Sequence, residues 1–204
     1  MTPNTIAKNH HLTLAIGTFF LHFVLWATGG VSEANAAPAL DAQPRTQART
    51  ATPGWRAGMQ LSGRERLRFL GFDIYQASLW VMPGFNPDGW AQHGFALELA
   101  YLRDFKGNAI ARRSLDEMRK LADVDEARAA RWEAALTRLL PDVRSGDRIT
   151  GVNLPGVGAR FIFNGQIAGE IADAEFARLF FGIWLSPATS EPALRQALLT
   201  RAMP

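Results

Sequence analysis

Residues 61–81, LSGRERLRFLGFDIYQASLWV, constrain the fold more than any other stretch of the chain. Most of this stretch alternates between apolar and polar side chains, which is typical of β-strands that bury one face. The pattern predicts two strands, over residues 61–70 and 72–81, with Gly71 as a kink or bulge between them. We therefore expect the ordered part of the chain to begin with a β-sheet, near residue 58.

Three arginines, Arg64, Arg66 and Arg68, fall at every second position of the first predicted strand and so share one face. Two interpretations are open. The arginines can protect an exposed sheet edge, where charges block aggregation. They can instead line a ligand pocket above the sheet and pair with an oxyanion or a carboxylate. Of the three, we expect Arg64 to be exposed, and Arg66 and Arg68 are the candidates for a pocket.

The rest of the chain predicts an α+β protein. After a loop rich in Pro and Gly, the pattern predicts a strand, two helices, three short strands and two final helices. Asn108, Asp173 and Ser190 are predicted helix caps, and Asn164-Gly165 is a predicted hairpin turn. Antiparallel strands with helices grouped between them indicate the α+β class. The elements are expected over residues 95–102, 109–122, 125–140, 148–154, 159–163, 166–171, 174–185 and 191–201.

The first 36 residues have the order of a secretory signal peptide. A start with Lys8 and no acid leads into the uncharged run LTLAIGTFFLHFVLWATGG, and Ala34 and Ala36 form an A-x-A site. We expect cleavage after Ala36 and a periplasmic protein. The alternative is a permanent N-terminal membrane anchor, because the apolar run is long enough to span a bilayer. Residues 37–57 predict a flexible linker, and residues 58–204 predict the domain.

Composition excludes several classes of function. The chain has no Cys, and beyond residue 36 it has a single His, His93. Thiolate sites, a Cys nucleophile and a His-rich zinc site are therefore excluded, and we expect no metal and no cofactor. The net charge of +3 comes from dispersed arginines, which argues against a nucleic-acid partner. A serine triad is not expected, since the chain lacks a G-x-S-x-G elbow.

Four blocks in the same order resemble the bacterial chalcone isomerase-like family. They are LSGRERLRFLGFDIYQASLWV, LRDFKGNAIARRSLDEM, SGDRITGVNLPGVGARFIFNGQIAGEI and FFGIWLSPATSEPALRQALL. The similarity covers nearly all of residues 58–204, and GIWL followed by Ser-Pro is its most specific part. The resemblance implies a chalcone isomerase-like open-faced β-sandwich, with an antiparallel sheet and helices packed on one side.

The resemblance also implies a site. In plant chalcone isomerases an Arg on the early strand stabilises the substrate phenolate, and a Thr, a Tyr and an Asn help to polarise the ketone. The Arg matches Arg66 or Arg68, and the Thr matches Tyr75, a phenol that can still donate. The helix positions match Ile110, which cannot donate, and Glu117, which brings a negative charge. Glu117 is also spaced i,i+4 from Arg113, and we expect that pair on the exposed side of the helix.

These departures favour a binding protein over an enzyme. Related non-catalytic proteins of this fold bind fatty acids through the Arg, which needs only the Arg and an apolar cleft. We therefore expect an exported, non-catalytic binder of a small apolar acid or fatty acid. Arg66 or Arg68 would hold the anion, and Tyr75 would be a second donor. The alternatives are an intramolecular lyase of chalcone isomerase type, with Arg66, Arg68 and Tyr75 as candidate catalytic residues, and a structural partner in the cell envelope.

Overall fold

The computed structural model describes residues 54–201 of the 204-residue chain. The predicted signal peptide, the cleavage site after Ala36 and almost all of the predicted linker lie outside the described residues. Within the described range, no helix combines the length and the apolar character that crossing a membrane requires.

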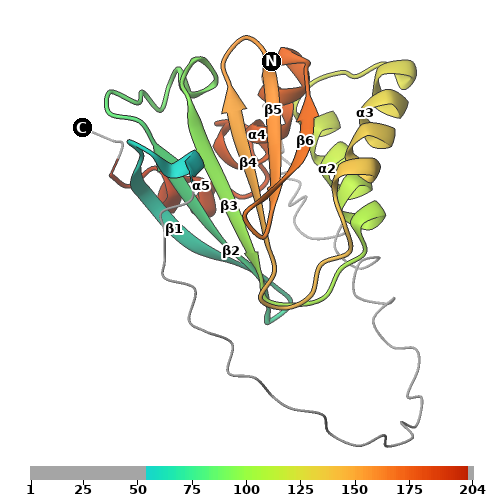
Figure 1. Ribbon diagram of the computed structural model, residues 1–204, viewed down its shortest axis with the longest axis horizontal. Helices are drawn as coiled ribbons and strands as arrows, with labels where there is room; N and C mark the ends of the chain where they lie inside the picture. Colours follow the sequence, from blue (N-terminus) through green and yellow to red (C-terminus); the bar gives the residue numbers. More distant parts are fainter. Residues whose placement is uncertain (1–53, 202–204) are drawn as a thin grey trace, which may run out of the picture. The chain divides into compact units, whose positions relative to one another are not determined.

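An antiparallel sheet forms the front layer of the domain (Figure 1). Within residues 54–201 it has six strands, and their order in the sheet follows their order in the chain. Short turns join some neighbouring strands, whereas the connection over residues 102–147 contains two helices. The strands are β1 (Gln60–Phe69), β2 (Phe72–Val81), β3 (Phe95–Tyr101), β4 (Arg148–Leu154), β5 (Gly158–Phe163) and β6 (Gln166–Ile171).

Two tight hairpin turns set the register of the outer strands. Leu70 and Gly71 both have positive φ, at 48° and 81°, and Asn164 and Gly165 repeat this at 47° and 85°. Paired positive φ values define a turn whose twist matches that of the flanking strands. The predicted Asn164-Gly165 hairpin is confirmed. Gly71 belongs to a two-residue turn between strands, and the irregularities of this hairpin lie earlier, between Leu61 and Gly63 and between Leu67 and Arg68.

Helices cover one face of the sheet, and Figure 1 shows α4 and α5 behind the strands. The predicted α+β class and open-faced β-sandwich are therefore confirmed. The α-helices within residues 54–201 are α2 (Gly107–Leu121), α3 (Glu126–Leu139), α4 (Ala174–Leu185) and α5 (Pro192–Leu198). Two short 3-10 helices, η1 (Gly54–Arg56) and η2 (Trp90–Gln92), complete the described part.

Phenylalanine rings join the sheet to α4. Phe95 of β3 meets Phe181 of α4 with ring centroids 4.9 Å apart. A Cβ atom on Gly151 of β4 would lie 2.9 Å from the Phe181 ring, so the absence of a side chain there lets the ring reach the sheet. Because side chains alternate along a strand, the same face of β2 and β3 presents Tyr75 and Tyr101, which are paired in the register.

Two of the predicted helix caps are wrong, because neither Asn108 nor Ser190 caps its helix. Helix α2 begins at Gly107, ahead of Asn108, and the Gly107 N–H donates to the Asp142 side chain at 2.9 Å. Helix α5 has Glu191 at its N-cap without a side-chain cap, and Ser190 bonds to α2. The Asp173 cap is confirmed, with the N–H groups of residues 175 and 176 donating to its carboxylate.

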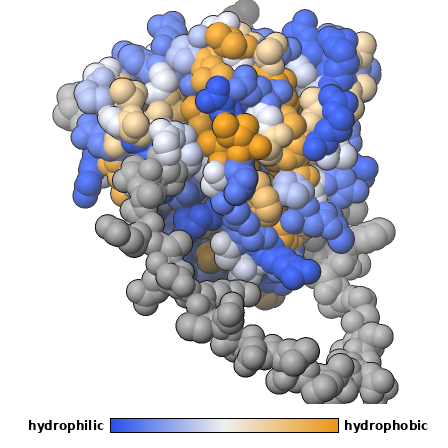
Figure 2. Space-filling view, viewed as in Figure 1, coloured by the Kyte–Doolittle hydropathy of each residue, from blue (hydrophilic) through white to orange (hydrophobic). Residues whose placement is uncertain are grey.

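The other face of the sheet is covered only in part within the described residues. Residues 54–59 lie on it, and Arg56 is held between the rings of Trp55 and Trp80 while it pairs with Glu98 at 3.2 Å. Figure 2 views this face and shows apolar side chains gathered over the central strands, bordered by hydrophilic residues. The apolar group comprises Ala96, Val152 and Ile162, with Trp55, Met59, Trp80 and Leu154 packed against it.

Candidate functional site

Arg66 and Arg68 lie at the turn end of the first hairpin and share one acid. Arg66 Nη1 is 2.7 Å from Asp73 Oδ2, and Arg68 Nε is 2.6 Å from Asp73 Oδ1. The two side chains are 47% and 67% exposed. Hydrogen bonds from Arg68, and then from Arg66, hold the pKa of Asp73 below its usual range. Both guanidinium groups therefore have a partner in solvent-facing surroundings.

Tyr75 faces the helices, and its side chain is partly buried. It pairs in the register with Leu67, whereas Arg66 pairs with Gln76, so Tyr75 and Arg66 project from opposite faces of the hairpin. Trp184 Nε1 of α4 donates to the Tyr75 hydroxyl oxygen at 2.9 Å, and the Tyr101 ring packs edge-on at 6.1 Å. The structure thus separates Tyr75 from Arg66. A role for Arg66 and Arg68 in ligand binding stays a prediction.

The Tyr75 hydroxyl has an unused hydrogen. Its oxygen accepts from Trp184, and within residues 54–201 its O–H donates no hydrogen bond. Burial raises the pKa of Tyr75 well above its ordinary value, so the phenol stays protonated at physiological pH. A protonated phenol fixed by one bond and free to donate a second is suited to meet a ligand oxygen.

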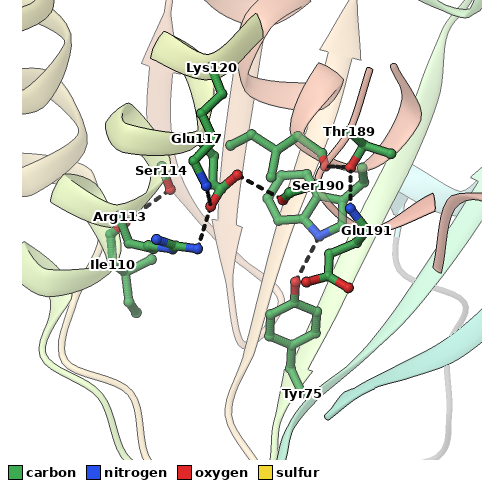
Figure 3. Close-up of polar contacts among 11 residues, drawn as sticks. Tyr75, Ile110, Arg113, Ser114, Glu117, Lys120, Thr189, Ser190 and Glu191 are labelled. Atoms are coloured by element: carbon green, nitrogen blue, oxygen red, sulfur yellow. Dashed lines mark hydrogen bonds and ion pairs between the residues drawn. The ribbon is translucent and has the colours of Figure 1, made fainter. Parts of the chain in front are cut away.

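Glu117 of α2 is the centre of a cluster of ion pairs, shown in Figure 3. We call Arg113, Glu117, Lys120 and Ser190 the Glu117 cluster. Arg113 pairs with Glu117, Lys120 Nζ lies 2.8 Å from Glu117 Oε1, and Ser190 Oγ donates to Glu117 Oε2 at 2.8 Å. The expected Arg113–Glu117 pair is present, but Glu117 is buried rather than exposed because Ser190 ties it to the segment ahead of α5.

Glu191 lies beside this cluster without a partner of its own. Its side chain is half-buried, and within the described part of the chain its carboxyl group makes no hydrogen bond or ion pair. Its backbone N–H donates to Thr189 Oγ1 at 3.1 Å, which fixes the residue at the start of α5. Burial, and then the negative charge of Glu117, raise the pKa of Glu191. In Figure 3 its carboxyl group and the Tyr75 hydroxyl point toward one another.

Apolar side chains lie beside Tyr75 in the sheet. Leu67 lies beside Tyr75 on β1, and Tyr101 lies beside it on β3. Phe105 packs on Tyr101 at 5.8 Å, and Ile110 of α2 is half-buried near the start of the helix. The candidate site therefore combines an apolar lining with Tyr75, Glu191 and the Glu117 cluster, which suits a largely apolar molecule with one polar end.

Sequence reasoning proposed Tyr75 as a site residue, treated Glu117 as a departure from the family pattern, and did not single out Glu191. The i,i+4 spacing of Arg113 and Glu117 was a usable signal for their pairing. Glu191 follows Ser190 in a stretch that reads as an ordinary helix start, and nothing local distinguishes it. In the described residues no group of three or more His, Cys, Asp or Glu side chains could hold a metal ion.

Comparisons with known proteins identify a family for the sequence and a solved structure of similar fold. A family model described as chalcone isomerase-like matches residues 57–200. Among solved structures, the fatty-acid binding protein AtFAP1 of Arabidopsis thaliana superposes with a TM-score of 0.56. The two sequences are 11% identical, and the match covers 71% of this chain and 88% of that one, so the likeness concerns the fold. Among curated protein sequences, none matches this chain.

Proposed function

Because this chain belongs to the chalcone isomerase-like family, we propose that it is a non-catalytic binding protein for a small apolar acid or a fatty acid. A solved neighbour of the same fold is a fatty-acid binding protein, which supports a binding role for the fold without naming the ligand here. The site would lie between β2, α2 and the start of α5.

The observation that carries this proposal is the spare hydrogen of Tyr75. Trp184 donates to the phenol oxygen, and within residues 54–201 the phenol O–H donates to no side chain. A buried donor without an acceptor costs free energy, on the order of 1–3 kcal/mol. A ligand carboxyl or carbonyl oxygen would recover that energy, while the ligand's apolar part would pack against Leu67, Tyr101 and Ile110.

Two helix residues argue against chalcone cyclisation. They are Ile110 and Glu117, which match positions where the resemblance to plant chalcone isomerases implies a Tyr and an Asn. Ile110 has no polar atom, and Glu117 already accepts from Arg113, Lys120 and Ser190. Neither residue is placed to polarise a ketone, so the binding role needs fewer assumptions than catalysis.

We further propose that residues 1–36 are a signal peptide, that cleavage follows Ala36, and that the protein works in the periplasm. Residues 37–57 would then be a linker. Native mass spectrometry of periplasmic protein, purified without detergent, would test both proposals at once. A mass that starts at Ala37, with an added lipid-sized mass, is the expected result. The mass of the intact chain would contradict the cleavage.

The first prediction concerns Tyr75→Phe. This change keeps the ring beside Tyr101 but removes the hydroxyl, so we expect at least a tenfold loss of affinity for an acid probe, in line with one lost hydrogen bond to a charged group. The measurement is fluorescence titration with 11-(dansylamino)undecanoic acid. Undiminished binding by Tyr75→Phe would place the ligand elsewhere.

The double variant Arg66→Leu with Arg68→Leu is the matched comparison. It removes two guanidinium groups that pair with Asp73 on the exposed hairpin end. If the acid binds at Tyr75, this variant keeps its affinity. Loss of binding in the double variant, together with normal binding by Tyr75→Phe, would move the anion site to the arginines, as the sequence pattern suggests.

An intramolecular lyase is the second candidate function, and one observation favours it. Tyr75 remains a protonated donor inside an apolar site, which is what polarising an enone carbonyl requires. The ligand phenolate would attack the enone β-carbon, and a proton would be added at the α-carbon. Following the absorbance of several hydroxychalcones with and without the protein tests this, and rates equal to those in buffer would exclude the flavonoid reaction.

A further inference from the structure

Three elements bring two carboxyl groups and one phenol together at the candidate site. Tyr75 comes from β2, Glu117 from α2, and Glu191 from the N-terminal end of α5 (Figure 3). The two acids are near enough for each to affect the ionisation of the other groups in the site. Two carboxylates in one partly enclosed place cannot both ionise freely, so the local cations decide which one holds the charge.

The two cationic side chains of the Glu117 cluster both form ion pairs with Glu117. Arg113 and Lys120 both pair with Glu117, and Ser190 donates to its second oxygen. Glu191 has no such bond in the described part of the chain, although Arg113 and Lys120 also favour its charge from a greater distance. Glu191 is therefore the acid of this pair that lacks a cationic partner within residues 54–201, and burial favours its protonated form.

The other charged groups around Glu191 do not change this assignment. On α5 itself, Arg195 uses its Nε–H for the backbone oxygen of Leu185 at 2.8 Å. On β1, Arg64 donates to Ser78 on the opposite face of the sheet, and the remaining neighbour from β2 is the neutral phenol of Tyr75.

A neutral Glu191 gives the site two hydroxyl donors that lack acceptors. One is the carboxyl O–H of Glu191, and the other is the phenol O–H of Tyr75. In Figure 3 the two groups point toward one another, and a ligand carboxylate between them would accept from both, in the short O–H···O⁻ bonds that are stronger than neutral ones. An ionised Glu191 would instead repel that carboxylate.

We propose that Glu191 is a ligand-contacting residue that binds, in its neutral form and together with Tyr75, the carboxylate of an acid ligand, so that the ligand enters with one proton. This inference rests on the proposed binding function, and it adds that an acid ligand binds together with one proton. Acid ligands bind more weakly as pH rises, because Glu191 must take up a proton to receive them. Ligands with an uncharged polar end do not carry this requirement.

The experiment is a fluorescence titration of the periplasmic protein between pH 5.5 and pH 8.5. One probe is 11-(dansylamino)undecanoic acid, and the other is its uncharged carboxamide. For the wild type we expect the Kd of the acid to rise about tenfold per pH unit once Glu191 ionises, as the uptake of one proton requires. The Kd of the carboxamide should stay within about twofold over the range.

Glu191→Gln keeps a donor of similar shape but cannot ionise. We expect this variant to bind the acid with nearly the same Kd at every pH. The matched control is Glu126→Gln on α3, an exposed acid outside the site, which should keep the pH slope of the wild type. Circular dichroism of each variant confirms that it is folded.

Each outcome decides the inference. A wild-type Kd for the acid that does not change with pH overturns it, as does a Glu191→Gln variant that keeps the slope. The carboxamide comparison needs no variant, so a slope shared by both probes also contradicts the role of Glu191. Failure of the wild type to bind either probe at any pH would overturn the proposed function as well, whereas binding without a slope would overturn this inference alone.

Discussion

Glu117 of α2 and Glu191 at the start of α5 differ in burial and in their hydrogen-bonding partners. Glu117 is buried and has three donors, whereas Glu191 is half-buried and has none within residues 54–201. The pKa of Glu191 is raised in the folded protein, so the folded state holds its proton more tightly than the unfolded state does. The stabilisation by this group is therefore present at low pH and is lost as pH rises through its folded pKa.

This residue-scale difference makes a prediction for the unliganded protein. At pH 8, Glu191→Gln should raise the free energy of unfolding by up to about 1 kcal/mol, because it removes a half-buried charge that water partly screens. At pH 4, where the wild-type group is mostly protonated in both states, the difference should nearly vanish. Urea denaturation at both pH values measures this. A variant that is less stable than the wild type at pH 8 would contradict it.

At the scale of elements, the position of Glu191 depends on how α5 lies against β1. Ser62 Oγ donates to the Leu198 backbone oxygen at 2.8 Å, which ties the end of α5 to the strand. A Cβ atom on Gly63 would lie 2.0 Å from the Ala197 backbone oxygen. The strand and helix can approach this closely only because residue 63 has no side chain.

Gly63→Ala should therefore separate α5 from β1. The blocking atoms belong to the backbone and cannot rotate away, so we expect a loss of about 1–3 kcal/mol in the free energy of unfolding and weaker binding of the acid probe. The control is Gly94→Ala, where a Cβ atom meets nothing within 4 Å. That variant should be nearly neutral in urea denaturation. Equal stability of the two variants would mean that α5 is not packed as described.

At the scale of the whole domain, the two faces of the sheet serve different purposes. The helix face holds the phenylalanine core and the candidate site. On the other face, Arg56 lies over the Trp80 ring at 3.9 Å and pairs with Glu98, which also accepts from Arg148 at 2.9 Å. This contact fixes the start of the described chain to the sheet and covers part of an apolar group.

Arg56→Ala should cost stability without affecting the ligand site. The change removes two ring contacts and one of the two arginines that neutralise the buried Glu98, so we expect a loss of about 1–3 kcal/mol. Arg160→Ala is the control, because Arg160 forms an exposed pair with Glu170. It should stay within about 0.5 kcal/mol of the wild type. A reversed order in urea denaturation would contradict the assignment.

The strands were the most predictable part of this protein. Predicted strands at 61–70 and 72–81 correspond to β1 at Gln60–Phe69 and β2 at Phe72–Val81. Alternation of side chains is a local property of an extended backbone, so it can be read without knowing the partners. The caps were less predictable. Asn108 and Ser190 have suitable side chains, but Asp142 caps α2 and Glu117 takes the Ser190 hydroxyl.

The sequence by itself determined the fold class and the family, while a binding role for Tyr75 stays a prediction. These depend on periodicity and on residues in a fixed order, which are properties of short stretches. Only the tertiary structure decided that Arg66 and Arg68 share Asp73, and that Tyr75, Glu117 and Glu191 come together. Their convergence requires α2 and α5 to pack on the same face of the sheet. No local sequence pattern specifies which side chains from distant elements then form hydrogen bonds or ion pairs with each other.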